Sequence, residues 1–266
     1  MQSLTAQGIL AELSSHLHFP LASTRNTITR HPTLSISASV VAVLFPLALR
    51  NYRSYKTLER GGFKFPVVGW AVSLLLKPVG RNTVTVEEYE KDSDKSSWLK
   101  AGDGPTEIPL RGRQRPKTGW HFLPHRQVEY FPNEKTQKLL TDEFKKIAET
   151  NSSLIQVGRS PHENFLNALL VHPSVQSPHP VTDASWREIG HVHSLKDFSM
   201  HVTLSPQDCK LVIEREWGER HPISGVIGLP KEYLMLYAPL TEDDVRVVGL
   251  IVRASVSYMT GTKNVH

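Results

Sequence analysis

The chain contains 266 residues, of which 39% are hydrophobic and 21% are charged, a composition that excludes collagen-like and wholly disordered proteins. Its 31 lysines and arginines outnumber its 26 acidic residues only slightly. These basic residues are scattered without a zinc finger, RNP or basic-zipper motif, so no nucleic-acid partner is expected. Cys209 is the only cysteine, which excludes an intramolecular disulfide and a cysteine-based zinc site.

Residues 33–49 form an uncharged apolar stretch near the lower length limit for a transmembrane helix, and Pro46 is tolerated in such a helix. A signal peptide is the less favoured interpretation, because the stretch begins far from Met1 and is followed by Arg50 instead of a small-residue cleavage site. More basic residues follow the stretch than precede it, so the positive-inside rule places the later residues in the cytosol. We therefore predict a single-pass anchor within residues 1–60, with the endoplasmic reticulum as the expected membrane.

A second apolar stretch, residues 65–76, is too short to span a bilayer and contains Pro66, Gly69 and Trp70. It fits an interfacial helix lying among lipid headgroups, and it fits equally a helix packed in the soluble domain. The chain is accordingly divided into the anchor segment, an interfacial or packing helix within residues 61–80, and a catalytic domain over residues 81–266.

Two helices are predicted in the first half of this domain. Apolar residues at helical spacing predict an exposed helix over residues 134–149. The run Ser160-Pro161-His162-Glu163 has the spacing of a capping box with proline at the first helical position. We therefore expect a short helix from Ser160 to about Leu170, which would place His162 apart from the histidines that follow.

The clearest pattern lies in the last 80 residues. Residues 198–204 alternate between apolar and polar side chains, which predicts a half-buried strand. Ser205 caps the next predicted helix, which is expected to end at Gly218, with Cys209 on its core-facing side.

A second strand is predicted over residues 233–238, followed by a long helix that begins after Thr241 and ends at Gly261. Together these elements form a C-terminal βαβα unit. Because few strands are detectable, the sequence favours a two-layer α+β domain over a doubly wound one.

Histidines are concentrated in the second half of the chain, where seven of the 13 lie between residues 162 and 221. His191 and His193 are two positions apart in an extended segment, so their rings project to one face. With His201 or Asp197 as a third ligand, they would form a facial set suited to non-haem iron or zinc. The spacing is not diagnostic, because histidines also satisfy buried backbone groups.

A longer pattern surrounds these histidines. It consists of Arg187-Glu188-Ile189-x-His191-x-His193, Asp197, His201, Gln207-Asp208, Trp217-Gly218-x-Arg220-His221-Pro222, Gly225, Leu236-Tyr237-Ala238-Pro239 and Tyr258-Met259-Thr260. The pattern covers about residues 185–261 and resembles the fungal luciferase family of luminous mushrooms. The chain length and the hydrophobic N-terminal stretch also agree with that family, whereas residues 80–180 match it poorly.

The resemblance implies a membrane-associated oxygenase that adds O2 to 3-hydroxyhispidin, a styryl α-pyrone, or to a related enolisable α-pyrone, with loss of CO2 and with light. O2 is then a co-substrate, no organic cofactor is expected, and metal binding becomes the less favoured hypothesis. Such chemistry needs a base, donors that hold a peroxide anion, and a dry pocket.

The histidine and arginine cluster offers groups for these tasks. The expected catalytic residues share a basic side chain: His191, His193, His201, Arg220 and His221. Of these, His191 or His193 is the expected base, and Arg220 and His221 are the expected holders of the peroxide anion. The expected substrate-binding residues are polar or aromatic: Asp197, Trp217 and Tyr237. The two aromatic rings would serve as walls for a flat substrate.

Three alternatives to a luminous oxygenase remain open at this point. A non-luminous tailoring enzyme of fungal secondary metabolism would use the same chemistry on another polyketide-type substrate. A metal-dependent enzyme would use His191, His193 and His201 as ligands. A membrane-anchored accessory protein would bind a hydrophobic intermediate without consuming O2.

Overall fold

The structure is a computed structural model that describes residues 31–58 and 60–266. The part of the predicted anchor segment that precedes residue 31 lies outside the described residues. The chain divides into two units, Met1–Ser54 and Tyr55–His266. The second unit contains the β-sheet and every residue of the predicted site.

Helix α3, Pro32–Lys56, contains the predicted apolar stretch and continues beyond it to Lys56. Within the described ranges it is the one helix long and apolar enough to cross a membrane, and its most apolar window is not buried. The apolar helix is therefore confirmed. A membrane span and a signal sequence both fit its length, composition and position, so its role as an anchor stays a prediction.

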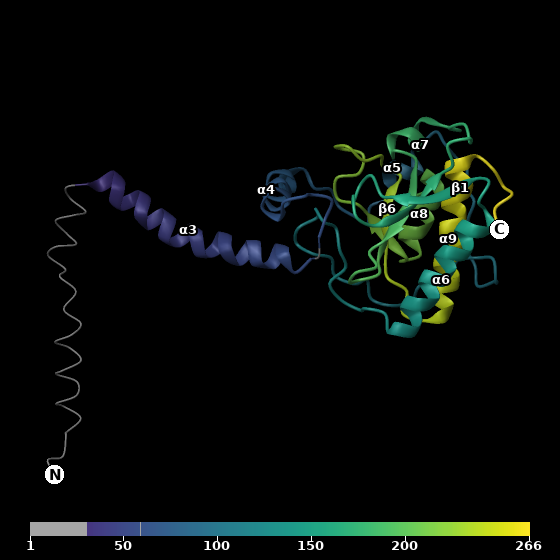
Figure 1. Ribbon diagram of the computed structural model, residues 1–266, viewed down its shortest axis with the longest axis horizontal. Helices are drawn as coiled ribbons and strands as arrows, with labels where there is room; N and C mark the ends of the chain where they lie inside the picture. Colours follow the sequence, from purple (N-terminus) through teal and green to yellow (C-terminus); the bar gives the residue numbers. More distant parts are fainter. Residues whose placement is uncertain (1–30, 59) are drawn as a thin grey trace, which may run out of the picture. The chain divides into compact units, whose positions relative to one another are not determined.

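A six-stranded antiparallel sheet forms the centre of the second unit, with strand order β1-β2-β3-β4-β6-β5 (Figure 1). The strands are β1 Ile155–Arg159, β2 Asn167–Val171, β3 Glu188–Val192, β4 Met200–Thr203, β5 Gly218–Arg220 and β6 Tyr233–Leu236. With the helices that accompany it, this sheet confirms the α+β class. Strands β4 and β6 lie inside the two predicted strands, and β3 contains His191 of the predicted extended segment, whereas β1, β2 and β5 were not predicted.

The helix expected from Ser160 to about Leu170 is wrong. The Glu163 N–H does donate to Ser160 Oγ at 3.0 Å, as in a helix cap. Asn164, however, adopts a left-handed conformation with φ of 60°, which breaks the helical path. The chain then enters β2, so the local capping signal marked a tight turn.

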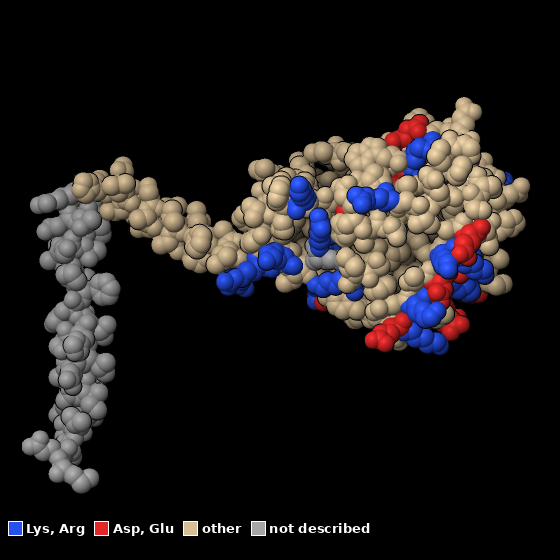
Figure 2. Space-filling view, viewed as in Figure 1, with Lys and Arg blue, Asp and Glu red and all other residues tan. Residues whose placement is uncertain are grey.

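The two longest helices of the second unit are α6 Glu134–Thr150 and α9 Glu242–Thr260. The shorter ones are α4 Pro66–Leu76, η1 Lys77–Val79, α5 Glu87–Glu90, α7 Pro180–Ala184 and α8 Pro206–Glu214. Helix α6 confirms the exposed helix predicted over 134–149. Figure 2 shows its acidic and basic side chains interleaved on the surface, and they include the i,i+4 pair Lys138–Asp142.

The predicted caps of α8 and α9 are confirmed. Ser205 Oγ accepts from the Asp208 N–H, and Thr241 forms a capping box at the start of α9. At the other end of α9, Gly261 has a φ of 69°, the left-handed C-cap that glycine favours. The predicted end of α8 at Gly218 is wrong, because the helix stops at Glu214 and Gly218 begins β5.

The sheet has two chemically different faces. Val202 lies opposite Leu234, and both belong to the hydrophobic core, where α9 packs on β2, β3 and β4. Side chains alternate between the faces, so His201, which lies opposite His191 and Met235, points the other way. We call this second surface the histidine face. The candidate site is built on it.

Candidate functional site

A cavity of about 330 Å³ lies over the histidine face, within the size range of small-molecule sites. Its polar and aromatic lining consists of His125, His162, Glu163, Asn164, Trp186, His201, His221 and Tyr233. Its apolar lining includes Phe63, Leu123, Ile223 and Ile227. The cavity therefore combines a largely apolar wall with a small number of imidazole groups, as small-molecule sites do.

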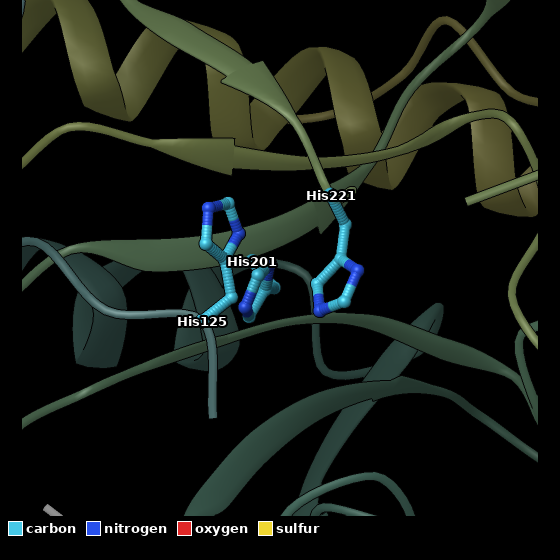
Figure 3. A group of neighbouring side chains, drawn as sticks. All are labelled: His125, His201 and His221. Atoms are coloured by element: carbon cyan, nitrogen blue, oxygen red, sulfur yellow. The ribbon is translucent and has the colours of Figure 1, made fainter. Parts of the chain in front are cut away.

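Three histidines from separate segments meet in this cavity (Figure 3). His201 comes from β4, His221 directly follows β5, and His125 comes from an irregular segment before α6. One ring nitrogen of each lies within 4.8 Å of the others. Although they line the cavity, the three residues are only 2 to 3% exposed, so their imidazoles act in a dry environment.

A second group of histidines adjoins the first. Ligand atoms of His191, His193 and His201 also lie within 4.8 Å of one another. The prediction that His191 and His193 project to one face and converge with His201 is therefore confirmed. His191 and His193 do not line the cavity, so they stand beside His201 within the protein.

Both ring nitrogens of His193 are occupied. The Arg126 guanidinium lies 3.0 Å from Nε2, and because a guanidinium only donates, Nε2 is the acceptor. The proton is then on Nδ1, which donates to Ser199 Oγ at 2.9 Å. Burial, and next the charge of Arg126, hold the pKa of His193 well below its ordinary value. This geometry disfavours His193 as the base or as a metal ligand.

The position of Arg126 is fixed by a buried ion pair that the sequence did not predict. Its guanidinium contacts both carboxylate oxygens of Glu163, at 3.1 and 2.9 Å. In the sequence, Glu163 was interpreted as part of a helix cap and residues near 126 carried no motif. The only feature of the sequence that could have indicated this part of the site is the adjacent pair His125-Arg126. Its role becomes evident only from contacts with residues distant in sequence.

Two buried glutamate–histidine pairs flank His201. Glu188 Oε1 lies 2.5 Å from His191 Nδ1, and Glu219 Oε1 lies 2.9 Å from His125 Nε2. Burial alone would raise the pKa of each carboxyl, but the histidine partners outweigh it and lower both values. Both glutamates are therefore ionised acceptors, and each fixes which ring nitrogen of its histidine carries the proton.

His162 is not apart from the other histidines, contrary to the prediction. Its ring stacks on Trp186 with centroids 4.9 Å apart and lies 5.0 Å from Tyr233. Tyr233 in turn stacks on His201 at 4.7 Å. These flat rings line one side of the cavity.

Arg220 does not join the histidine cluster, contrary to the prediction. It precedes His221 in an extended segment, so the two side chains point to opposite faces of the sheet. The guanidinium lies 2.9 Å from Glu88 and over the ring of Tyr89. Of the two predicted anion-binding residues, the structure brings only His221 into the cavity.

The three predicted substrate-binding residues lie outside the cavity lining. Trp217 packs in the hydrophobic core and donates to the Pro109 carbonyl at 2.7 Å. Tyr237 donates to Glu219 Oε2 at 3.0 Å, which places it behind the Glu219–His125 pair. Asp197 accepts from Ser199 Oγ at 2.7 Å and so supports His193. Tyr237 and Asp197 therefore contact the partners of the histidines.

The fold and the cavity together define an α+β domain with a histidine-lined small-molecule site. Residues 186–255 match the family model described as the Luciferase domain. The chain is 30% identical to a luciferase of Armillaria gallica over 236 residues, covering 84% of this chain and 85% of that protein. It is 29% identical to a luciferase of Neonothopanus nambi over 243 residues, covering 86% and 88%. No solved structure matches the chain.

The chain therefore belongs to the luciferase family of luminous mushrooms. It is an enzyme of the oxidoreductase class, an oxygenase. The family match contains β3 to β6 and four of the clustered histidines, but it does not include His125, Arg126 or Glu163.

The Arg126–Glu163 pair gives the first prediction. Arg126→Met leaves the Glu163 carboxylate buried without its partner, and we expect a loss of about 3–5 kcal/mol in the free energy of unfolding. Adding Glu163→Gln removes the unpaired charge and should recover much of that loss. Urea denaturation of the single and double variants measures both. Equal destabilisation in the single and the double variant would contradict the pairing.

The second prediction concerns pH. Burial holds the pKa values of His193, His201 and His221 well below their ordinary value. Above about pH 6.5 these histidines are neutral in both states, whereas below it the unfolded chain binds protons that the folded chain does not. We therefore expect the free energy of unfolding to fall between about pH 7.5 and about pH 5.5, by up to about 1.4 kcal/mol per pH unit for each histidine.

Urea denaturation across that pH range tests this expectation. His201→Gln should reduce the slope, because one of the three titrating rings is removed. His172→Gln, which removes an exposed ring beyond β2, is the matched control and should leave the slope unchanged. A His201→Gln slope equal to that of the unmodified chain would contradict the buried neutral state.

Proposed function

We propose that this oxygenase adds O2 to 3-hydroxyhispidin or a related enolisable α-pyrone, with loss of CO2 and emission of light. O2 is the co-substrate, and no organic cofactor takes part. A non-luminous tailoring enzyme of fungal secondary metabolism is the variant of this proposal that performs the same chemistry on another polyketide-type substrate without light. The proposal extends to this chain what the family resemblance implies.

The observation that carries the proposal is the cavity itself. Its volume of about 330 Å³ and its stacked rings, Tyr233 on His201 and Trp186 on His162, suit a flat aromatic substrate of moderate size. The same cavity presents neutral imidazoles, which accept and donate protons near neutral pH. A planar, acidic enol is the class of substrate that uses both features.

The proposed reaction follows from this environment. An imidazole nitrogen takes the enol proton, and the resulting enolate adds O2 to give a peroxide anion whose breakdown releases CO2. In a buried site, N–H donors hold the developing negative charge more strongly than they would in water. Exclusion of water protects the reactive product. Of the two predicted anion holders, Arg220 and His221, only His221 takes this role, and His201 accepts a hydrogen bond from the substrate.

A metal-dependent enzyme is the second candidate, favoured by the two groups of three histidines. Arg126 beside His193 disfavours the predicted set of His191, His193 and His201. The set of His125, His201 and His221 faces the cavity and fits a three-histidine metal site better. Metal analysis separates the two candidates, because a stoichiometric ion that restores activity after chelation would replace the metal-free proposal.

The third prediction tests the activity. The full chain, in membranes and supplied with 3-hydroxyhispidin, should consume O2 and emit photons. His201→Ala should lower turnover about 10²-fold, because it misplaces the substrate. His179→Ala is the matched control, since that ring also stacks on a tyrosine, Tyr258, but lies outside the cavity. Binding of the pyrone without O2 consumption would identify an accessory protein instead.

Membrane attachment completes the proposed function. We propose that α3 anchors the chain in the endoplasmic reticulum, with the later residues in the cytosol, and that α4 lies at a lipid interface. The exposed apolar side chains of α4 and the residue before it support this: Phe65, Val67, Val68 and Leu75. Lys77 follows them and lies over the ring of Trp120 at 4.5 Å, a combination common at the headgroup level.

The fourth prediction tests this interface in the full chain. Cys209 is fully buried, so a cysteine introduced at the surface can be labelled selectively. A polarity-sensitive dye at Leu75→Cys should shift to the blue when the protein is reconstituted in liposomes. The same dye at Lys138→Cys, on the charged surface of α6 and about as exposed, should not. Identical spectra at the two positions would contradict the interfacial role of α4.

A further inference from the structure

His125 stands in the cavity with its imidazole backed by a carboxylate, and the sequence did not identify it as functional. We propose that His125 is the general base that removes the enol proton of the pyrone, and that Glu219 is its positioning residue. This assignment rests on the proposed function and specifies the residue that begins it.

The proton position on His125 follows from its partner. Glu219 is ionised and its Oε1 lies 2.9 Å from Nε2, so Nε2 carries a hydrogen, and in the neutral ring that acts as a base the free lone pair is on Nδ1. Tyr237 donates to the other oxygen, Oε2, at 3.0 Å. The carboxylate is thereby held in one orientation, and the imidazole with it.

The free lone pair belongs to a residue that lines the cavity. Nδ1 of His125 is buried and has no hydrogen-bond partner among the described residues. His125 lines the cavity, and one of its nitrogens is within 4.8 Å of a nitrogen of His201 and of His221. An unsatisfied buried acceptor is unfavourable. A hydroxyl of the bound pyrone is the donor that this position lacks.

The other histidines are less suited to this role. His201 donates from Nδ1 to the Leu234 carbonyl at 3.1 Å, and a neutral carbonyl stabilises a protonated ring less than a carboxylate does. His193 has both nitrogens occupied. His191 is backed by Glu188 in the same manner but does not line the cavity.

His221 carries a hydrogen-bond donor, which complements the acceptor on His125. The Ile223 N–H donates to its Nδ1 at 3.3 Å, and burial keeps the ring neutral by lowering its pKa. Its single hydrogen is therefore on Nε2, where the backbone carbonyl of Phe122 is a partner that the enolate must replace or share. The cavity thus offers an acceptor on His125 and a donor on His221, the pair of groups that removal of a proton from an enol requires.

The proposed step is balanced within the site. The enol O–H bond breaks, the proton moves to Nδ1 of His125, and the electron pair stays on the oxygen. The imidazolium is paired with the Glu219 carboxylate, so the histidine–glutamate pair becomes neutral. The enolate oxygen accepts from His221 Nε2–H, and the enolate is the electron donor for O2 in the step that follows.

Enolate formation can be observed separately from oxygenation. The full chain is mixed with 3-hydroxyhispidin without oxygen, and the absorption band of the pyrone enolate is recorded. We expect the band in the unmodified chain, and we expect His125→Ala to bind the pyrone without it. When air is admitted, His125→Ala should turn over at least about 10²-fold more slowly, and added imidazole should restore part of the rate.

The two glutamates provide a matched control. Glu219→Gln should weaken the band at least about tenfold, and Glu219→Asp should restore part of it. Glu188→Gln alters an equally buried glutamate–histidine pair outside the cavity, and it should leave the band unchanged. If the carboxylates only stabilise the fold, both Gln variants will lose the band in proportion to their loss of thermal stability, which overturns the proposal.

The outcomes also separate this inference from the proposed function. A band that persists in His125→Ala, with O2 uptake intact in the unmodified chain, overturns His125 as the base and leaves the oxygenation standing. A band that needs His125 in a chain that consumes no O2 leaves His125 standing and overturns the oxygenation. O2 uptake in an unmodified chain that forms no band also overturns His125.

Discussion

The buried guanidinium of Arg126 connects the irregular segments of the domain to the sheet. It donates to the Arg60 and His125 carbonyls, to both oxygens of Glu163 and to His193 Nε2. Apart from the neighbouring His125, these groups come from three segments distant in sequence, and one planar group satisfies them all. The walls of the cavity therefore depend on a single ion pair, and the proton position on His193 depends on it as well.

In the histidine cluster, the neighbours of each ring dictate the position of its proton. Carboxylates fix His125 and His191, a carbonyl fixes His201, a guanidinium fixes His193, and a backbone N–H fixes His221. Burying five imidazoles is tolerable because each polar group that fixes a ring is itself hydrogen-bonded or ionised. The same arrangement leaves a few nitrogens free to act on a ligand.

The sequence predicted what local patterns determine. The caps of α8 and α9, helix α6, strands β4 and β6 and the convergence of His191 with His193 and His201 depend on residues close together in sequence or on strand alternation. The turn at Ser160 was misassigned because a hydroxyl that accepts a nearby N–H looks the same in a turn and in a helix cap. Arg220 was misplaced because β5 was not recognised, so its alternation with His221 went unnoticed.

The sequence did not identify three residues of the site, His125, Arg126 and Glu163, for a different reason. Their contacts span 37 to 94 residues, and His125 and Arg126 lie in a segment without regular helix or strand. No sequence periodicity identifies such positions, because the residues come together only in the folded domain. Their role in the site therefore cannot be predicted before the positions of the strands are known.

The boundaries of the family match indicate which part of the cavity can change between related enzymes. Residues 186–255 contain the histidine-bearing strands, which form the floor of the cavity, whereas the segments around residues 61–63, 123–125 and 161–164 form its roof. Loops tolerate sequence change far better than a packed sheet does. Relatives that keep the floor and His125 but exchange the rest of the roof would retain the proton chemistry while accepting pyrones of other shapes, so differences in substrate should be sought upstream of the matched domain.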